Sequence, residues 1–198
     1  TGLIYLFFII AVFLNKNIPY RWFILALSYL AMIFTYSRST YLSFLLAFTF
    51  ISLKLKNIKI FFFSLLIIIF SIFLLPRRPG EGTKLERTSS ITAKIDNYKE
   101  GVNLFAQSPL IGFGYNHIPF IRQNRNPISH ANSGFDGSLL TLLVTTGLIG
   151  TTLFILGIKQ TYLDSSLLKQ TFIWTVLFHS LFANSLLYPW ILLSLVLF

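Results

Sequence analysis

Long runs without Lys, Arg, Asp or Glu dominate the chain, and shorter polar stretches separate them. Seven such apolar runs can be marked, at 1–14, 22–37, 39–53, 60–75, 138–158, 170–187 and 190–198. A helix that crosses the hydrocarbon core of a membrane needs about 20 apolar residues, with a range of about 17–25. The runs at 60–75 and 138–158 reach that length with their flanks. The pattern therefore predicts an all-α, polytopic bundle of transmembrane helices.

Arg38 separates two apolar runs, 22–37 and 39–53, that are each short for a full span. Two arrangements fit: two tilted short helices that meet at Arg38, or one long helix with an arginine inside the membrane. An arginine near the bilayer centre costs about 2.5–3.5 kcal/mol on insertion scales. Such a residue usually faces a wet cavity or the bundle interior, where its guanidinium can bind phosphate through paired hydrogen bonds. An arginine in an ordinary interfacial turn is the alternative.

The connection 54–59 carries three lysines and is the densest basic cluster between close apolar runs. The positive-inside rule places it in the cytoplasm. By parity, the long segment 76–137 then faces outward, and the turn at 159–169 is again cytoplasmic. A hairpin that places Arg38 outside satisfies the rule at every short loop, so we prefer the hairpin.

The segment 76–137 is the one region of water-soluble character, with eight of the 16 basic residues and five of the six acidic ones. Its apolar residues recur at helical spacing, which predicts an amphipathic helix at about 90–107. The residues of that apolar stripe are Ile91, Ile95, Tyr98, Val102 and Phe105. We expect the helix to lie on the membrane face or to pack against the bundle. Ser108-Pro109 ends it, and two glycines then permit a tight turn at 109–114.

Composition agrees with a membrane protein, because 55% of residues are hydrophobic and only 11% are charged. Ordinary soluble domains carry about 25% charged residues. The formal net charge is +10. In a lipid-embedded chain, this excess favours anionic lipids or phosphate-bearing substrates as partners, and no nucleic acid. The alternative is that the excess reflects only the positive-inside rule of membrane proteins.

The chain begins and ends inside apolar runs, so we expect a piece of a longer protein with a truncated first and last helix. We divide it into transmembrane helices at 1–75, an extracytoplasmic loop at 76–137 and transmembrane helices at 138–198.

His130 is the strongest candidate for proton transfer. It lies shortly before the run 138–158, which places it at the outer rim of the membrane. Imidazole titrates near neutrality and can accept a proton from a hydroxyl. The alternative is a polar interfacial residue bonded to lipid or loop backbone. His117 is a weaker candidate, and His179, within an apolar run, fits a helix–helix hydrogen bond better.

Familiar catalytic and metal-binding motifs are absent from the sequence, which has no Cys, no HExxH, no GK(S/T) phosphate loop and no GxSxG. Asp96 and Glu100 share a helix face, but Lys94 and Lys99 neighbour them. A solvated surface is therefore the better interpretation of these carboxylates.

Three stretches resemble motifs of the O-antigen ligase and polymerase superfamily. Residues 35–42, TYSRSTYL, are similar to its T-x-S-R segment that continues with S or G. Residues 93–114 are similar to its R-x-x-x-W … P-L-x-G-x-G stretch, and 130–150 to its H-x-H-N-x-F/Y … G-L-I/V-G stretch. The likeness runs from about residue 22 to the C-terminus. That family has many membrane spans and one large outward loop.

The resemblance implies a glycosyltransferase of the bacterial inner membrane, with its active face outside the cytoplasm, in lipopolysaccharide or capsule synthesis. Such proteins move a glycan from a polyprenyl (undecaprenyl) diphosphate carrier to a hydroxyl of a glycan or lipid acceptor, with no cofactor and no metal ion. It implies Arg38, Arg87 and Lys94 as diphosphate-binding residues, because fixed cations stabilise the leaving group. It implies His130 as the base. Further glycan or phosphate contacts are expected at Arg122, Arg125 and Asn132.

The sequence departs from the family pattern at three positions. Lys94 replaces an arginine, so it keeps the positive charge but cannot bind a phosphate through paired hydrogen bonds as a guanidinium does. Tyr98 replaces a tryptophan. Asn132 stands in place of the second histidine and cannot act as a base.

Two other functions stay open. A transporter or flippase for an anionic lipid or glycan would show charged or helix-breaking residues inside several spans. A non-catalytic scaffold of a polysaccharide assembly machine would suit these substitutions.

Overall fold

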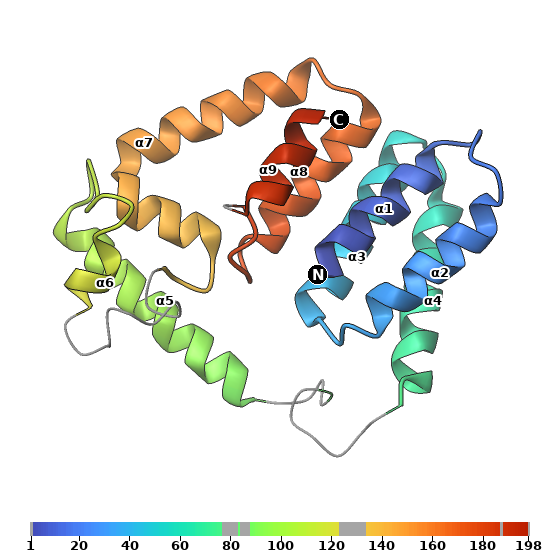
Figure 1. The fold of residues 1–198 in the computed structure, drawn as a ribbon, viewed down its shortest axis with the longest axis horizontal. Coiled ribbons are helices and arrows are strands. Elements are labelled where there is room, and N and C mark those ends of the chain that lie inside the picture. The colour runs from blue at the N-terminus through green and yellow to red at the C-terminus, as the bar shows by residue number, and fades with distance from the viewer. Residues whose placement is uncertain (1, 77–82, 84–87, 123–133, 187, 198) are drawn as a thin grey trace. The chain divides into compact units, whose positions relative to one another are not determined.

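A computed structural model describes residues 2–76, 83, 88–122, 134–186 and 188–197 of the chain. All regular secondary structure within these residues is helical, which confirms the all-α prediction (Figure 1). The helices form two compact units, each described here by itself. The first unit takes the described residues of 1–87, 165–176 and 194–198, and the second takes those of 88–164 and 177–193.

The first unit contains four helices that coincide with the first four apolar runs, since uncharged runs of Leu, Ile and Phe satisfy their backbone hydrogen bonds internally. They are α1 (Gly2–Leu14), α2 (Arg21–Ile33), α3 (Arg38–Lys54) and α4 (Ile58–Leu74). Helix α1 packs against α2 and α3, and α3 packs against α4. The first part of α8 (Leu167–His179) belongs to the same unit, where Phe172 stacks on Phe7 with ring centroids 4.4 Å apart.

The chain forms two helices around Arg38, not one long one, since α2 ends at Ile33 and α3 begins at Arg38. Tyr36 takes a left-handed conformation, with φ 51°, and so helps to reverse the chain. The Ser37 side chain caps α3 by accepting a hydrogen bond from the backbone N–H of Thr40, at 3.4 Å. The turn that ends one helix and starts the next is thus encoded locally.

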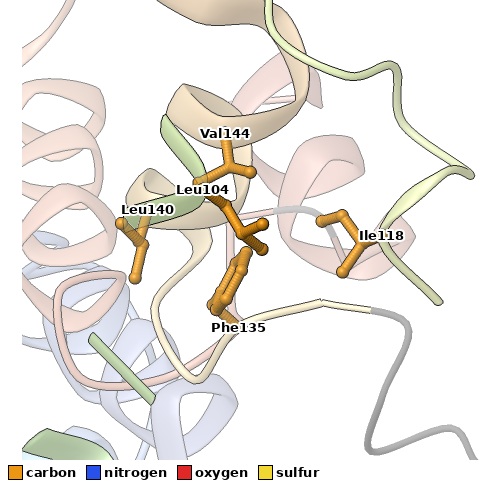
Figure 2. Close-up of a cluster of buried hydrophobic side chains, with 5 residues drawn as sticks. All are labelled: Leu104, Ile118, Phe135, Leu140 and Val144. Atoms are coloured by element: carbon orange, nitrogen blue, oxygen red, sulfur yellow. The ribbon is translucent and has the colours of Figure 1, made fainter. Parts of the chain in front are cut away.

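The second unit is built on α5 (Ser89–Gln107) and α7 (Ser138–Leu163), which pack against each other. It also holds the short α6 (Ile118–Ile121), the last residues of α8 and the start of α9 (Pro189–Leu197). Helix α5 lies where the apolar spacing predicted a helix at 90–107. The core between these elements is a cluster of buried side chains, shown in Figure 2: Leu104, Ile118, Phe135, Leu140 and Val144.

The buried line of α5 differs from the apolar stripe marked in the sequence. Asn97, Gly101 and Leu104 are buried. Three residues of the stripe, Ile91, Ile95 and Val102, are instead 46%, 48% and 54% exposed. The contact with α7 therefore lies to one side of the stripe and leaves much of it uncovered.

Helix α7 is interrupted at Gly147, whose φ of 63° and ψ of −167° are not helical, and Figure 1 shows the resulting bend. The run 138–158, expected as one span, therefore lies within a single long helix that carries a break at Gly147. Helix α8 ends at His179, before the predicted run ends at 187, because residues 180–186 turn back.

One helix within the described residues, α7, is long and apolar enough to cross a membrane by length and composition. Helices α1, α2 and α4 are also apolar but have 13, 13 and 17 residues. The arrangement with many spans stays a prediction.

Candidate functional site

Three of the seven predicted site residues lie in the described part of the chain: Arg38 in the first unit, and Lys94 and Arg122 in the second. The other four lie outside the described residues, namely Arg87, Arg125, His130 and Asn132. The convergence of these groups around one histidine therefore stays a prediction.

Arg38 is the first residue of α3 and is half-buried. Hydroxyl groups surround this helix start, because the Ser37 and Ser39 oxygens are 3.2 Å apart and Thr40 donates to Ser37 at 2.9 Å. The positive end of a helix dipole favours anions. Chemically, this turn combines a guanidinium, hydroxyls and a helix N-terminus, all of which suit a phosphate group.

Lys94 and Tyr98 lie one turn apart on α5, and both hold the turn that follows α8. The Lys94 ammonium donates to the carbonyl of Phe182, and the Tyr98 hydroxyl donates to the carbonyl of Leu181. Carbonyl groups just beyond a helix C-terminus lack partners within the helix, so these two side chains supply them. Burial raises the pKa of the Tyr98 phenol above its usual 10.0, and the nearby Asp136 carboxylate raises it further. The phenol therefore stays protonated and able to donate.

Further polar contacts join α5, the segment 134–138 and the turn 179–186, and we call this region the polar junction. Asn97 accepts a hydrogen bond from the backbone of Asp136, at 2.9 Å. Ser138 donates to the Ala183 carbonyl at 3.1 Å and accepts from the Leu186 backbone at 3.0 Å. The buried His179 is 3.0 Å from the hydroxyl of Ser185.

The sequence did not predict the polar junction, because its three segments are far apart along the chain. Its one sequence signal is the pair Asn184-Ser185, which interrupts an apolar run. His179 is not mid-span, as the sequence suggested, because it closes α8 and lies within this junction. His117, the weaker histidine candidate, is exposed at the start of α6.

An ion pair between the buried Arg122 and the partly exposed Glu100 lies in the second unit. The Arg122 Nε and Nη2 atoms bind the two carboxylate oxygens at 2.7 and 2.5 Å, and Nη1 donates to the Gly134 carbonyl at 2.9 Å. The guanidinium also lies 4.7 Å from the ring centroid of Phe135. The Arg122 side chain has no exposed surface.

This pair corrects the expectation that Glu100 belongs to a solvated surface. Asp96 does lie at such a surface, 3.9 Å from Lys99, but Glu100 faces Arg122 and the second unit's interior. Arg122 and Gly134 flank the residues 123–133, which include Arg125, His130 and Asn132. The pair therefore ties both flanks of that segment to α5.

Two glycine-containing stretches meet in what we call the glycine junction, formed by residues 109–114 and 144–149. Gly112 and Gly147 have φ values of 66° and 63°, which side chains rarely permit. A methyl group added to Gly112 would strike the backbone of Thr145, and one added to Gly147 would strike the backbone of Leu110. The turn at 109–114 thus packs backbone to backbone against the break in α7.

No group of three or more His, Cys, Asp or Glu side chains could share a metal ion in the parts of the chain with described coordinates. The functional groups described above are cations, hydroxyls, amides and the buried imidazole of His179.

The comparison with protein families identifies the family of this chain. A family model described as O-antigen ligase matches residues 22–155. The chain belongs to the O-antigen ligase family. The matched residues include the turn at Arg38, all of α5 and the glycine junction. No curated protein and no solved structure matches the chain.

Membership in the O-antigen ligase family confirms the resemblance seen in the sequence. It indicates a membrane protein of the bacterial inner membrane, with a ligase or polymerase type of function in polysaccharide assembly. Lipid-linked glycans and their acceptors are, in general terms, the partners that this family implies.

Proposed function

We propose that this O-antigen ligase family member is a multi-spanning glycosyltransferase that works outside the cytoplasmic membrane. It moves a glycan from a polyprenyl diphosphate carrier to a hydroxyl of a glycan or lipid acceptor. The observation that carries the proposal is the family match over 22–155, which contains Arg38, Lys94 and His130 in one continuous stretch.

In the proposed reaction, the imidazole of His130 accepts the proton of the acceptor hydroxyl as its oxygen attacks the anomeric carbon of the donor glycan. The bond between that carbon and the diphosphate oxygen breaks, and negative charge develops on the leaving diphosphate. Arg38, Arg87 and Lys94 stabilise this charge as fixed cations. Arg125 and Asn132 contact the glycan.

Arg122 acts in this scheme as a positioning residue. Its guanidinium nitrogens are engaged by Glu100 and the Gly134 carbonyl, and its side chain is fully buried. These contacts support a role in holding the flanks of the segment that carries His130, in place of a direct contact with glycan or phosphate.

The central experiment replaces His130 by Ala in the full-length protein, with His117→Ala as the matched control. We expect His130→Ala to abolish transfer to the acceptor and to leave the lipid-linked donor unconsumed at normal expression. His117→Ala should retain transfer. Unchanged glycan assembly in the His130→Ala protein would remove this histidine from the mechanism.

A transporter or flippase is separated from a transferase by vesicles that lack any acceptor. Net accumulation of lipid-linked glycan on one side of such vesicles would favour transport. A scaffold is separated by a triple variant that lacks Arg38, Arg87 and His130. Rescue of glycan assembly by this variant would favour a non-catalytic role.

The proposed topology places 76–137 outside and 54–59 in the cytoplasm. The chain has no Cys, so a single cysteine in place of Lys99 can report its side of the membrane. Lys99 is 72% exposed in its side chain. We expect a membrane-impermeant thiol reagent to label this cysteine in intact spheroplasts, and a cysteine at Lys56 to react only after lysis.

A further inference from the structure

The break in α7 removes two hydrogen bonds that a continuous helix would contain. In an α-helix each N–H bonds the carbonyl four residues earlier, so Leu148 would bond Val144 and Ile149 would bond Thr145. All four of these backbone groups instead bond the turn at 109–114. The replacing bonds run from Phe113 N–H to Val144 O (3.0 Å), Gly114 N–H to Thr145 O (2.8 Å), Leu148 N–H to Pro109 O (2.9 Å), and Ile149 N–H to Leu110 O (3.1 Å).

Complete pairing of a broken helix is what a lipid environment requires. Water could satisfy the freed groups of a break at an exposed site, whereas hydrocarbon cannot, and each unsatisfied group there costs several kcal/mol. Broken helices at membrane depth are found where protein supplies the missing partners. The glycine junction meets that condition with protein backbone alone.

The outer surface of the glycine junction is apolar. Leu110 and Ile111 on the turn are 62% and 72% exposed, and Leu148 and Ile149 on α7 are 49% and 54% exposed. The backbone hydrogen bond from Ile149 to Leu110 brings these two pairs of exposed apolar residues together at the junction, and we call the four residues the apolar patch. From there to its end at 163, α7 has no buried residue, so the patch begins the exposed stretch of the helix.

Helix length places this patch inside the bilayer. Lys159 is the first charged residue of α7 beyond Gly147. In the topology proposed above, it marks the cytoplasmic boundary of the membrane. Lys159 is twelve positions after Gly147, and at 1.5 Å per residue this is a helical rise of about 18 Å. The hydrocarbon core is about 30 Å thick, so Gly147 lies within the core and does not reach the outer boundary of the membrane. Tilting of the helix would place it deeper still.

We propose that the glycine junction is a re-entrant contact within the outer leaflet, in which Leu110 and Ile111 insert among lipid acyl chains. The occupant of the apolar patch is therefore bilayer lipid. This inference rests on the membrane orientation proposed above but not on the transfer chemistry. It adds a lipid-embedded anchor to a segment that the sequence places wholly outside.

The test is a depth measurement in the full-length protein reconstituted in phosphatidylglycerol-containing vesicles. A single cysteine replaces Ile111 and carries an environment-sensitive fluorophore, and Lys99→Cys is the water-exposed control. We expect a blue-shifted emission from the Ile111 site and strong quenching by lipids spin-labelled along the acyl chain. The Lys99 site should be quenched by aqueous iodide instead. Emission from Ile111 that matches the Lys99 control would overturn the proposal.

A second variant guards against disturbance by the label. Ile149→Cys, on the α7 side of the patch, should report the same depth as Ile111→Cys. Shielding of the labelled protein from iodide without quenching by spin-labelled lipid, together with disulfide formation between copies of the unlabelled Ile111→Cys protein, would assign the patch to a second protein chain and overturn the lipid assignment. The depth measurement should give the same result in His130→Ala protein, because the proposed contact does not depend on the transfer reaction.

Discussion

Arg122 binds both carboxylate oxygens of Glu100, with hydrogen bonds of 2.7 and 2.5 Å. The arginine side chain is fully buried, and 30% of the glutamate side chain is exposed. Removing one partner of such a pair leaves the other charge without its counter-ion in a poorly solvated place. The pair also links α5 to Gly134, so its loss reaches both flanks of the segment with His130.

We therefore expect Glu100→Gln to lower the free energy of unfolding by about 3 kcal/mol, as breaking a buried pair does. Thermal unfolding in detergent measures this change. Asp96→Asn is the matched control, because its pair with Lys99 is exposed and contributes less than about 1 kcal/mol. Equal losses in the two variants would contradict a special role for the buried pair.

The glycine junction makes a second prediction. Gly147→Ala should destabilise the protein by about 2 kcal/mol or more, because its φ of 63° and ψ of −167° lie in a region that essentially only glycine occupies, where other residues cost about 1–3 kcal/mol, and the added methyl meets the backbone of Leu110. Gly112→Ala should behave alike. The unfolding temperature in lipid nanodiscs measures both.

Gly157→Ala is the control for these glycines, since an added methyl group has nothing within 4 Å there. It lies in the same helix, where alanine is favoured over glycine by about 1 kcal/mol. This variant should be at least as stable as the parent. A comparable loss at position 157 would show that α7 is generally sensitive to substitution.

Tyr98 predicts a dependence on alkaline pH. The folded-state pKa of its phenol is raised above the unfolded value of 10.0, first by burial and then by Asp136. Its stabilising contribution is therefore complete below pH 10.0 and is lost as the pH rises through the folded-state pKa. Tyr98→Phe should lose about 1 kcal/mol at neutral pH with the hydrogen bond to Leu181.

The comparison of unfolding curves below and above this pKa is the measurement. The difference between parent and Tyr98→Phe should shrink as the pH rises, because only the parent loses the contact. A constant difference at all pH values would show that the phenol does not ionise on unfolding.

Lys94 predicts a separation between stability and donor use. Lys94→Met removes the contact with Phe182 and should lower the free energy of unfolding by about 1 kcal/mol. Because Lys94 is a proposed diphosphate ligand, the Lys94→Met substitution should also raise the donor concentration needed for half-maximal transfer. The Lys99→Met substitution should not. Lost stability with unchanged donor dependence would restrict Lys94 to holding the polar junction.

Most helices of this protein follow from local sequence. Uncharged runs of Leu, Ile and Phe become α1, α2, α3 and α4 because helical hydrogen bonds close within each run. The apolar spacing of 90–107 coincides with α5, and Ser37 caps the helix that begins at Arg38. The family, too, was recognisable from short motifs. The site around His130 rested on those motifs alone, and it stays a prediction because four of its residues lie outside the described chain.

Tertiary structure decided what local pattern cannot encode. Asn97, Gly101 and Leu104 are buried on α5 because α7 packs there, although the stripe with Ile91 is more apolar. Glu100 pairs with Arg122 because a later segment folds back onto it. The helix at Gly147 breaks because a turn from over thirty residues earlier supplies its missing hydrogen bonds. Helix formation satisfies backbone groups within one segment, but buried charges and broken helices need partners that only the folded chain brings near.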